Sequence, residues 1–106
     1  MVTAEQIQAG KTLAEAAGLA MYQKVGERDA CGFGWVDVYV DRTNSKQAQE
    51  LIRAGFSKSY KPKCLSMWDP AGIPTQSISV KEAGAYAYAE YLTKLGLKAY
   101  AGSRMD

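Results

Sequence analysis

The sequence predicts an α+β domain: a ferredoxin-like β-α-β-β-α-β antiparallel sheet with an additional N-terminal helix. Three observations predict it: a period-two run from Cys31 to Val40, capping patterns at Thr3 and Ser79, and the order of the segments. From Cys31 onward that order is strand, helix, strand, strand, helix, strand. The right-handed crossover rule then places both later helices on one face of the sheet, with the first strand near its centre.

The N-terminal helix is expected from Thr3 to about Val25. Thr3 and Gln6 match a capping box, and Gly26 suits a left-handed C-cap. Its apolar positions recur at helical spacing, but many of them are Ala or Gly. Such a shallow stripe allows close helix packing.

The first strand, Cys31 to Val40, has two different faces. One face carries Gly32, Gly34, Val36, Val38 and Val40, and the other carries Cys31, Phe33, Trp35, Asp37 and Tyr39. A second helix, capped by Thr43 or Asn44, is expected to end at Gly55. The valine face is the one predicted to lie under the crossover helices.

The second half of the chain supplies the remaining elements. Strong turn residues separate two short strands, and a second capping box opens the last helix. In order, we predict a strand at Lys63–Trp68, a turn at Asp69–Pro74, a strand at Thr75–Ser79, a helix from Ser79 to Gly96 and a strand at Leu97–Gly102.

Length and composition indicate one globular domain. The chain has 106 residues, of which 47% are hydrophobic and 23% charged, which is typical of a soluble fold with a single core. We therefore treat residues 1–106 as one domain, with 1–29 forming the N-terminal helix and its connection and 30–106 the ferredoxin-like core.

Composition excludes several chemistries. The chain has no histidine, which removes the Ser/His triad and the usual imidazole metal ligands. Cys31 and Cys64 are too few for a thiolate zinc site and too far apart for a C-x-x-C pair. Asp37, Asp41 and Arg42 could bind a polar ligand but include no matched acid and base. The sequence predicts a protein that is not an enzyme and has no metal or cofactor.

The same evidence predicts a cytoplasmic protein. The N-terminal residues are polar and acidic, unlike a signal peptide, and no apolar run approaches the roughly 18 residues of a membrane span. The two cysteines are then expected to be reduced thiols.

The aromatic face of the first strand is the main candidate for function. Phe33, Trp35 and Tyr39 are expected there, joined by Trp68 and Tyr100. So large an apolar surface is expected to be covered. Three covers are possible: the N-terminal helix, a second copy in a homodimer, or a ligand. With Arg104, these aromatic residues could form a pocket for a planar anionic ligand such as a nucleotide.

Single-stranded nucleic acid is the alternative ligand. A basic segment follows the first strand and would add phosphate contacts; it contains Arg42, Lys46, Arg53, Lys58, Lys61 and Lys63. Two observations oppose this interpretation: Asp37 lies between Trp35 and Tyr39, and the net charge is only +2.

Arg104 gives a separate expectation for the end of the chain. Its guanidinium is suited to a bidentate carboxylate, which Asp37, Asp41 or Asp69 could supply. We therefore expect the last residues to be held in place rather than frayed.

Several sequence blocks resemble a known family. In order they are Cys31–Val36, Trp68–Gly72, Thr75–Ser77, Lys81–Ala85 and Ala99–Asp106. Together they resemble a family of small uncharacterised bacteriophage proteins, for which no activity is known. The resemblance implies a phage origin and a role in the cytoplasm of an infected bacterium. We therefore expect a small non-enzymatic interaction protein, itself a homodimer, that binds a host component, either a protein or a signalling nucleotide, and modulates it.

Overall fold

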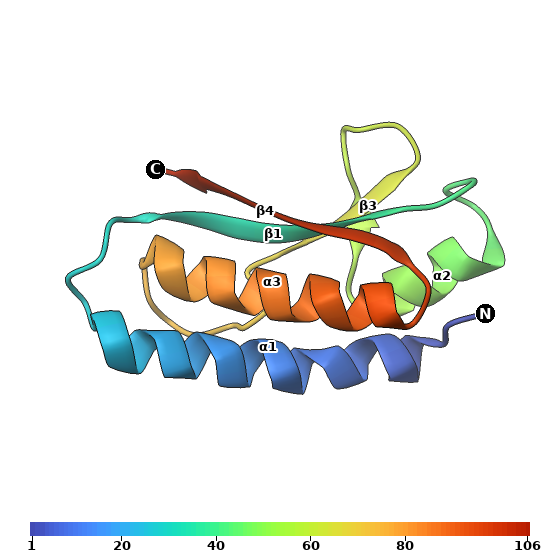
Figure 1. Ribbon diagram of the computed structural model, residues 1–106. Coiled ribbons are helices and arrows are strands. Elements are labelled where there is room, and N and C mark those ends of the chain that lie inside the picture. The colour runs from blue at the N-terminus through green and yellow to red at the C-terminus, as the bar shows by residue number, and fades with distance from the viewer.

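The computed structural model describes all residues, Met1 to Asp106, as three helices and a four-stranded antiparallel sheet (Figure 1). The elements in order are α1 (Ala4–Val25), β1 (Gly32–Tyr39), α2 (Lys46–Arg53), β2 (Ser57–Lys58), β3 (Cys64–Trp68), α3 (Ile78–Lys94) and β4 (Lys98–Met105). None of the helices is both long enough and apolar enough to cross a membrane.

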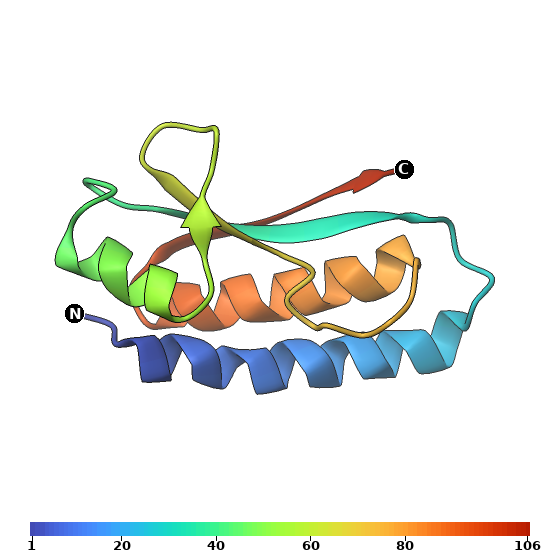
Figure 2. The ribbon, with the colours of Figure 1, turned by 180° about the vertical axis from the view of Figure 1, so that it is seen from behind.

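The sheet has the order β2-β3-β1-β4, and every neighbouring pair is antiparallel. As predicted, β1 is an inner strand and both α2 and α3 lie on one side of the sheet (Figure 2). Val36 and Val38 are fully buried beneath these helices and belong to the main core. The valine face of β1 is therefore the packed face, as its period-two pattern indicates.

The N-terminal helix packs on the helix layer and not on the sheet. Figures 1 and 2 show α3 between the sheet and α1. The Tyr88 hydroxyl donates to the Ile7 carbonyl at 2.8 Å, and the Tyr91 hydroxyl donates to the Gln6 carbonyl at 2.7 Å. A Cβ at Gly10 would lie only 2.5 Å from the Tyr91 ring. The shallow stripe of α1 thus allows a close contact with α3.

The predicted third strand is wrong. Thr75–Ser79 contributes only one bridge, Cys31 to Ser77, and then α3 begins at Ile78. The N-cap is Ser77, and not Ser79 as predicted: the Ser77 hydroxyl accepts from the Val80 amide and donates to Asp29 at 2.6 Å. Because these residues cap a helix, they do not pair along β3.

The strand next to β3 is instead β2, which has only two residues, Ser57 and Lys58. The expected ferredoxin-like sheet is thus confirmed only as an α+β fold with four antiparallel strands and an N-terminal helix. Three of its strands, β1, β3 and β4, lie where the sequence predicts them, and the fourth is β2 in place of Thr75–Ser79.

Two element boundaries also differ from the predicted ones. The N-cap of α2 is Ser45, whose hydroxyl accepts from the Ala48 amide, and not Thr43 or Asn44. The last strand extends beyond Gly102 to Met105. The capping box of α1 at Thr3 is confirmed.

Candidate binding face

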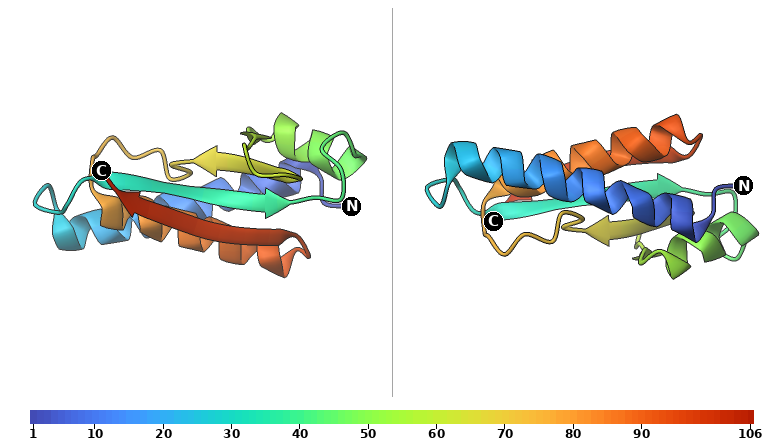
Figure 3. Two further views of the ribbon diagram at one scale, coloured as in Figure 1. Left: turned by 90° about the horizontal axis from the view of Figure 1, so that it is seen from above. Right: turned by 90° about the horizontal axis from the view of Figure 1, so that it is seen from below.

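One face of the sheet carries no helix. Seen from above in Figure 3, the strands lie in front of the helices, and α1 lies behind them. We call this surface the open face. Its residues follow from the strand register, because directly opposed residues point to the same side of a sheet. They are Phe33, Trp35, Asp37 and Tyr39 of β1, Cys64, Ser66 and Trp68 of β3, and Lys98, Tyr100, Gly102 and Arg104 of β4.

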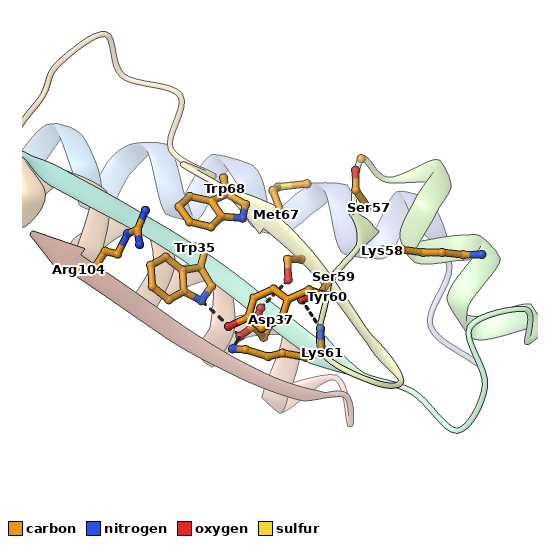
Figure 4. A pocket seen from close by; sticks show the side chains of 12 residues that line it. Trp35, Asp37, Ser57, Lys58, Ser59, Tyr60, Lys61, Met67, Trp68 and Arg104 are labelled. Carbon is orange, nitrogen blue, oxygen red and sulfur yellow. Dashed lines mark hydrogen bonds and ion pairs between the residues drawn. The ribbon is translucent and has the colours of Figure 1, made fainter. Parts of the chain in front are cut away.

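Aromatic rings form two groups along the open face. Trp35 and Trp68 stack with ring centroids 4.8 Å apart (Figure 4). Phe33 meets Trp68 edge-on at 5.9 Å. Tyr39 and Tyr100 form a second edge-on pair at 5.9 Å. Trp68 is 52% exposed, so its ring remains accessible to a planar ligand.

Gly102 makes room for the Trp35 indole. A Cβ at this position would lie 2.5 Å from the indole ring, because Trp35 lies over the Gly102 backbone on the neighbouring strand. The ring is therefore fixed between β4 on one side and Trp68 on the other.

Asp37 lies at the centre of the open face and is 6% exposed. One carboxylate oxygen accepts from Lys61 Nζ at 2.7 Å and from Trp35 Nε1 at 3.3 Å, and the other accepts from Ser66 Oγ at 2.5 Å. Burial acts to raise the pKa of Asp37, but the hydrogen bonds from Lys61 and Ser66 outweigh it and hold the pKa below its ordinary value. The hydrogen bond to Asp37 in turn raises the pKa of Lys61. The two charges therefore compensate each other at neutral pH.

Lys61 reaches Asp37 from the loop of residues 59–63, which connects β2 and β3 and rises above the sheet in Figures 1 and 2. Two hollows of about 660 and 680 Å³ share Trp35, Asp37 and Lys61. The first also includes Trp68, Lys58, Tyr60 and Arg104, and the second includes Tyr39, Tyr100 and Lys98. Four basic residues thus line the hollows, against Asp37 as the one acidic residue.

The six predicted binding residues all lie on the open face: Phe33, Trp35, Tyr39, Trp68, Tyr100 and Arg104. The N-terminal helix does not cover them, which leaves a second copy or a ligand among the three expected covers.

The predicted basic segment does not form a single patch. Lys58 and Lys61 line the first hollow, whereas Arg53 forms an ion pair with Glu50 at 2.9 Å and lies 3.8 Å from Glu5 of α1. The other three residues of the segment lie outside both hollows: Arg42, Lys46 and Lys63. The basic patch is therefore smaller than the sequence predicts, because the basic residues on α2 lie away from the open face.

Arg104 differs from its predicted role. It forms no ion pair, so none of the three expected partners, Asp37, Asp41 and Asp69, holds it. Its guanidinium instead lies 5.4 Å from the centre of the Phe33 ring, a cation–π distance. The end of the chain is nevertheless held, because β4 pairs with β1 as far as Met105.

Sequence reasoning missed Lys98, Ser66 and the role of Lys61. The sequence could have placed Lys98 on this face, because it follows the same alternation along β4 as Tyr100 and Arg104. No sequence pattern could have identified the role of Lys61, since it contacts Asp37 from a loop 24 residues away.

The cysteines are separate and free: Cys31 is exposed and Cys64 is buried. Burial raises the pKa of the Cys64 thiol, which disfavours the thiolate. The chemistry that the open face offers is therefore ring stacking and the binding of anions by lysine and arginine.

Comparison of the chain with protein-family models, with curated proteins and with solved structures finds no match. The function therefore has to be inferred from the geometry of the open face.

Proposed function

We propose that this domain is a non-catalytic binding module whose open face holds nucleotides, either free or within a single strand of nucleic acid. The observation that carries the proposal is the half-exposed ring of Trp68, stacked on Trp35 and bordered by lysine and arginine side chains. Bases stack on such rings with about 1–3 kcal/mol per base, and basic side chains contact their phosphates.

The charge arrangement supports an anionic ligand. Asp37 would repel phosphate if it were unpaired, but Lys61 compensates its charge at 2.7 Å. Lys58, Lys98 and Arg104 form no ion pair within the chain and border the two hollows. The compensation of Asp37 removes the main objection that the sequence raised against a nucleic-acid ligand.

The size of the hollows fits the same ligand. Volumes of about 660 and 680 Å³ fall within the roughly 300–1,000 Å³ of small-molecule sites. Each hollow has its own exposed aromatic ring, Trp68 in the first and Tyr100 in the second. In this proposal two bases stack side by side across the sheet, with Lys61 between them.

The resemblance to small phage proteins extends the proposal to a biological role. The nucleotide or nucleic acid would belong to the infected bacterium, and binding would modulate a host process. A host protein as the partner is the second candidate, and the exposed aromatic cluster is the observation that favours it.

The decisive experiment is a titration of tryptophan fluorescence with mononucleotides, dinucleotides and single-stranded oligonucleotides at low salt. We expect binding, and we expect Trp68→Ala to weaken it by about 5- to 150-fold, the loss of one stacked base. Leu19→Ala is the control, since Leu19 is 45% exposed on α1, which packs on the far side of α3 from the sheet. Equal affinity in wild type and Trp68→Ala, or no binding to any of these ligands, would reject the proposal.

Salt dependence separates free nucleotides from a nucleic-acid strand. If the ligand is a strand, the logarithm of the binding constant falls steeply with the logarithm of salt concentration, and Lys58→Gln reduces the slope by about 1. Lys46→Gln is the matched control, because Lys46 is exposed on α2 and lines neither hollow. A shallow slope that Lys58→Gln leaves unchanged would indicate a free nucleotide.

A further inference from the structure

The β4 edge of the sheet is long and pairs with no further strand. Its eight residues pair with β1 in an unbroken register from Gly32 opposite Met105 to Tyr39 opposite Lys98, without a bulge. No strand pairs with its other side, and in the left view of Figure 3 β4 forms the outer border of the sheet. β4 contains no proline, and an unpaired edge strand without proline can pair with another chain.

The backbone hydrogen bonds show which groups face outward. The Asp106 amide donates to the Cys31 carbonyl at 3.1 Å, so Asp106 and every second residue before it turn toward β1. The residues between them turn their backbone groups to the free edge: Ala99, Ala101, Ser103 and Met105. Of their carbonyls, that of Ala99 accepts from the Thr93 hydroxyl at 3.3 Å. The edge therefore retains donors and acceptors for a further strand.

The side chains of β4 are complementary to themselves in one register. A two-fold axis perpendicular to the sheet places one residue opposite its own copy. Residues at equal distances before and after that residue then lie opposite each other in the two chains. Centred on Gly102, the axis sets Lys98 opposite Asp106 of the partner subunit and Tyr100 opposite the partner's Arg104. Centred on Ala101, it would set Lys98 opposite the partner's Arg104, which is a repulsive pair.

From these observations we propose that two copies of this chain pair through their β4 edges, antiparallel, with the two-fold axis at Gly102. Ala101 then exchanges backbone hydrogen bonds with Ser103 of the partner subunit, and opposite charges meet at both ends of the pairing. We choose a second copy as the partner because the charges of β4 are complementary to those of an antiparallel copy: Lys98 meets the partner's Asp106 at each end.

The helix layer below β4 agrees with this arrangement. Tyr86 is 62% exposed on α3, although it is a large side chain beside the core. It lies one helical turn after Glu82, whose carboxylate accepts from the Ser103 hydroxyl of β4, so Tyr86 is on the flank of α3 toward this edge. In the dimer Tyr86 lies beside the two-fold axis, where it approaches the partner's Tyr86.

The pairing would also double the open face. Because the axis is perpendicular to the sheet, the two open faces point to the same side and become continuous across Tyr100 and Arg104. The dimer does not depend on what this face binds, so it can be tested alone.

The experiment measures self-association by sedimentation, using Lys98→Glu and Asp106→Lys. Both side chains are exposed and form no hydrogen bond or ion pair within the chain, so both variants should fold. We expect a wild-type dimer and about tenfold weaker association for each variant alone, because each places two like-charged pairs in the interface. An equal mixture of the two variants should recover wild-type association, since both pairs are again opposite in charge.

Lys58→Glu is the matched control, because it makes the same charge change at the β2 edge. It should associate like the wild type. A monomeric wild type, single variants that associate as strongly as wild type, or a mixture that shows no recovery would each overturn the proposal.

Discussion

The two faces of β1 are made of different residue types and differ in what they contribute. On the helix side Gly34, Val36 and Val38 are buried against α3 and the main core. On the open side Trp35 and Tyr39 stay partly exposed, although they are larger. Hydrophobic side chains normally contribute to stability by burial, and these two are only partly buried. The difference indicates that the helix side determines stability, and it is the reason why we propose the open side as the binding surface.

Asp37 shows how the open side tolerates a buried charge. It is placed among aromatic rings, and it is satisfied by Lys61, Ser66 and Trp35. Such a network holds neighbouring rings in fixed positions, because each partner has defined geometry. The open face is therefore ordered before any ligand binds, which reduces the entropic cost of binding.

The largest effect is expected on the helix side. Leu65 of β3 is fully buried, and Leu65→Ala should lower the free energy of unfolding by about 2–5 kcal/mol through lost burial and a residual cavity. Urea unfolding followed by circular dichroism measures it. Ser57→Ala, at the exposed strand position opposite Ser66 of the open face, should change stability by less than about 0.5 kcal/mol. Similar losses in both variants would contradict the assignment of stability to the helix side.

The packed side of the fold could be predicted from sequence where the signal is local. The alternation in β1 located its two faces, and Thr3 with Gln6 located the start of α1. Local signals also failed where two patterns competed: Thr75–Ser79 alternates like a strand, but Ser77 caps α3. β2 has two residues, which is too short for any periodicity.

The open face required long-range information. Its aromatic residues could be predicted, because they follow the period of β1 and β3. The sequence could not predict that α1 leaves these residues uncovered. Gly10 and Gly18 of α1 provide no apolar side chain, so they do not indicate which surface the helix packs against. The Asp37–Lys61 pair joins a strand to a loop that has no sequence pattern.

A smaller loss is expected at Asp37. Asp37→Asn removes the charge that pairs with Lys61, and should lower the free energy of unfolding by about 1–2 kcal/mol at pH 7. The pKa of Asp37 is lowered in the fold from 3.8, so its contribution is complete above pH 4 and is lost as pH falls through the lowered pKa. The stability difference between the two proteins should therefore shrink below about pH 4.

The complementary variant reverses that pH dependence. In Lys61→Gln, burial acts on Asp37 without the opposing lysine, so the pKa of Asp37 should rise. Urea unfolding at several pH values should then show a loss of stability on raising pH through the new pKa. An unchanged pH profile in Lys61→Gln would mean that the pair does not control this carboxyl group.

The smallest effect on stability is expected at Tyr60, which is 94% exposed at the loop over the first hollow. Tyr60→Ala removes almost no buried area, so the free energy of unfolding should change by less than about 0.5 kcal/mol. Binding should still weaken by about fivefold, since a ring at the wall of the hollow adds contact with a stacked base. The fluorescence titration that tests Trp68→Ala measures this loss, with Leu19→Ala as the shared control. If Tyr60→Ala binds as tightly as wild type, the loop serves only to bring Lys61 to Asp37, and recognition is confined to the sheet.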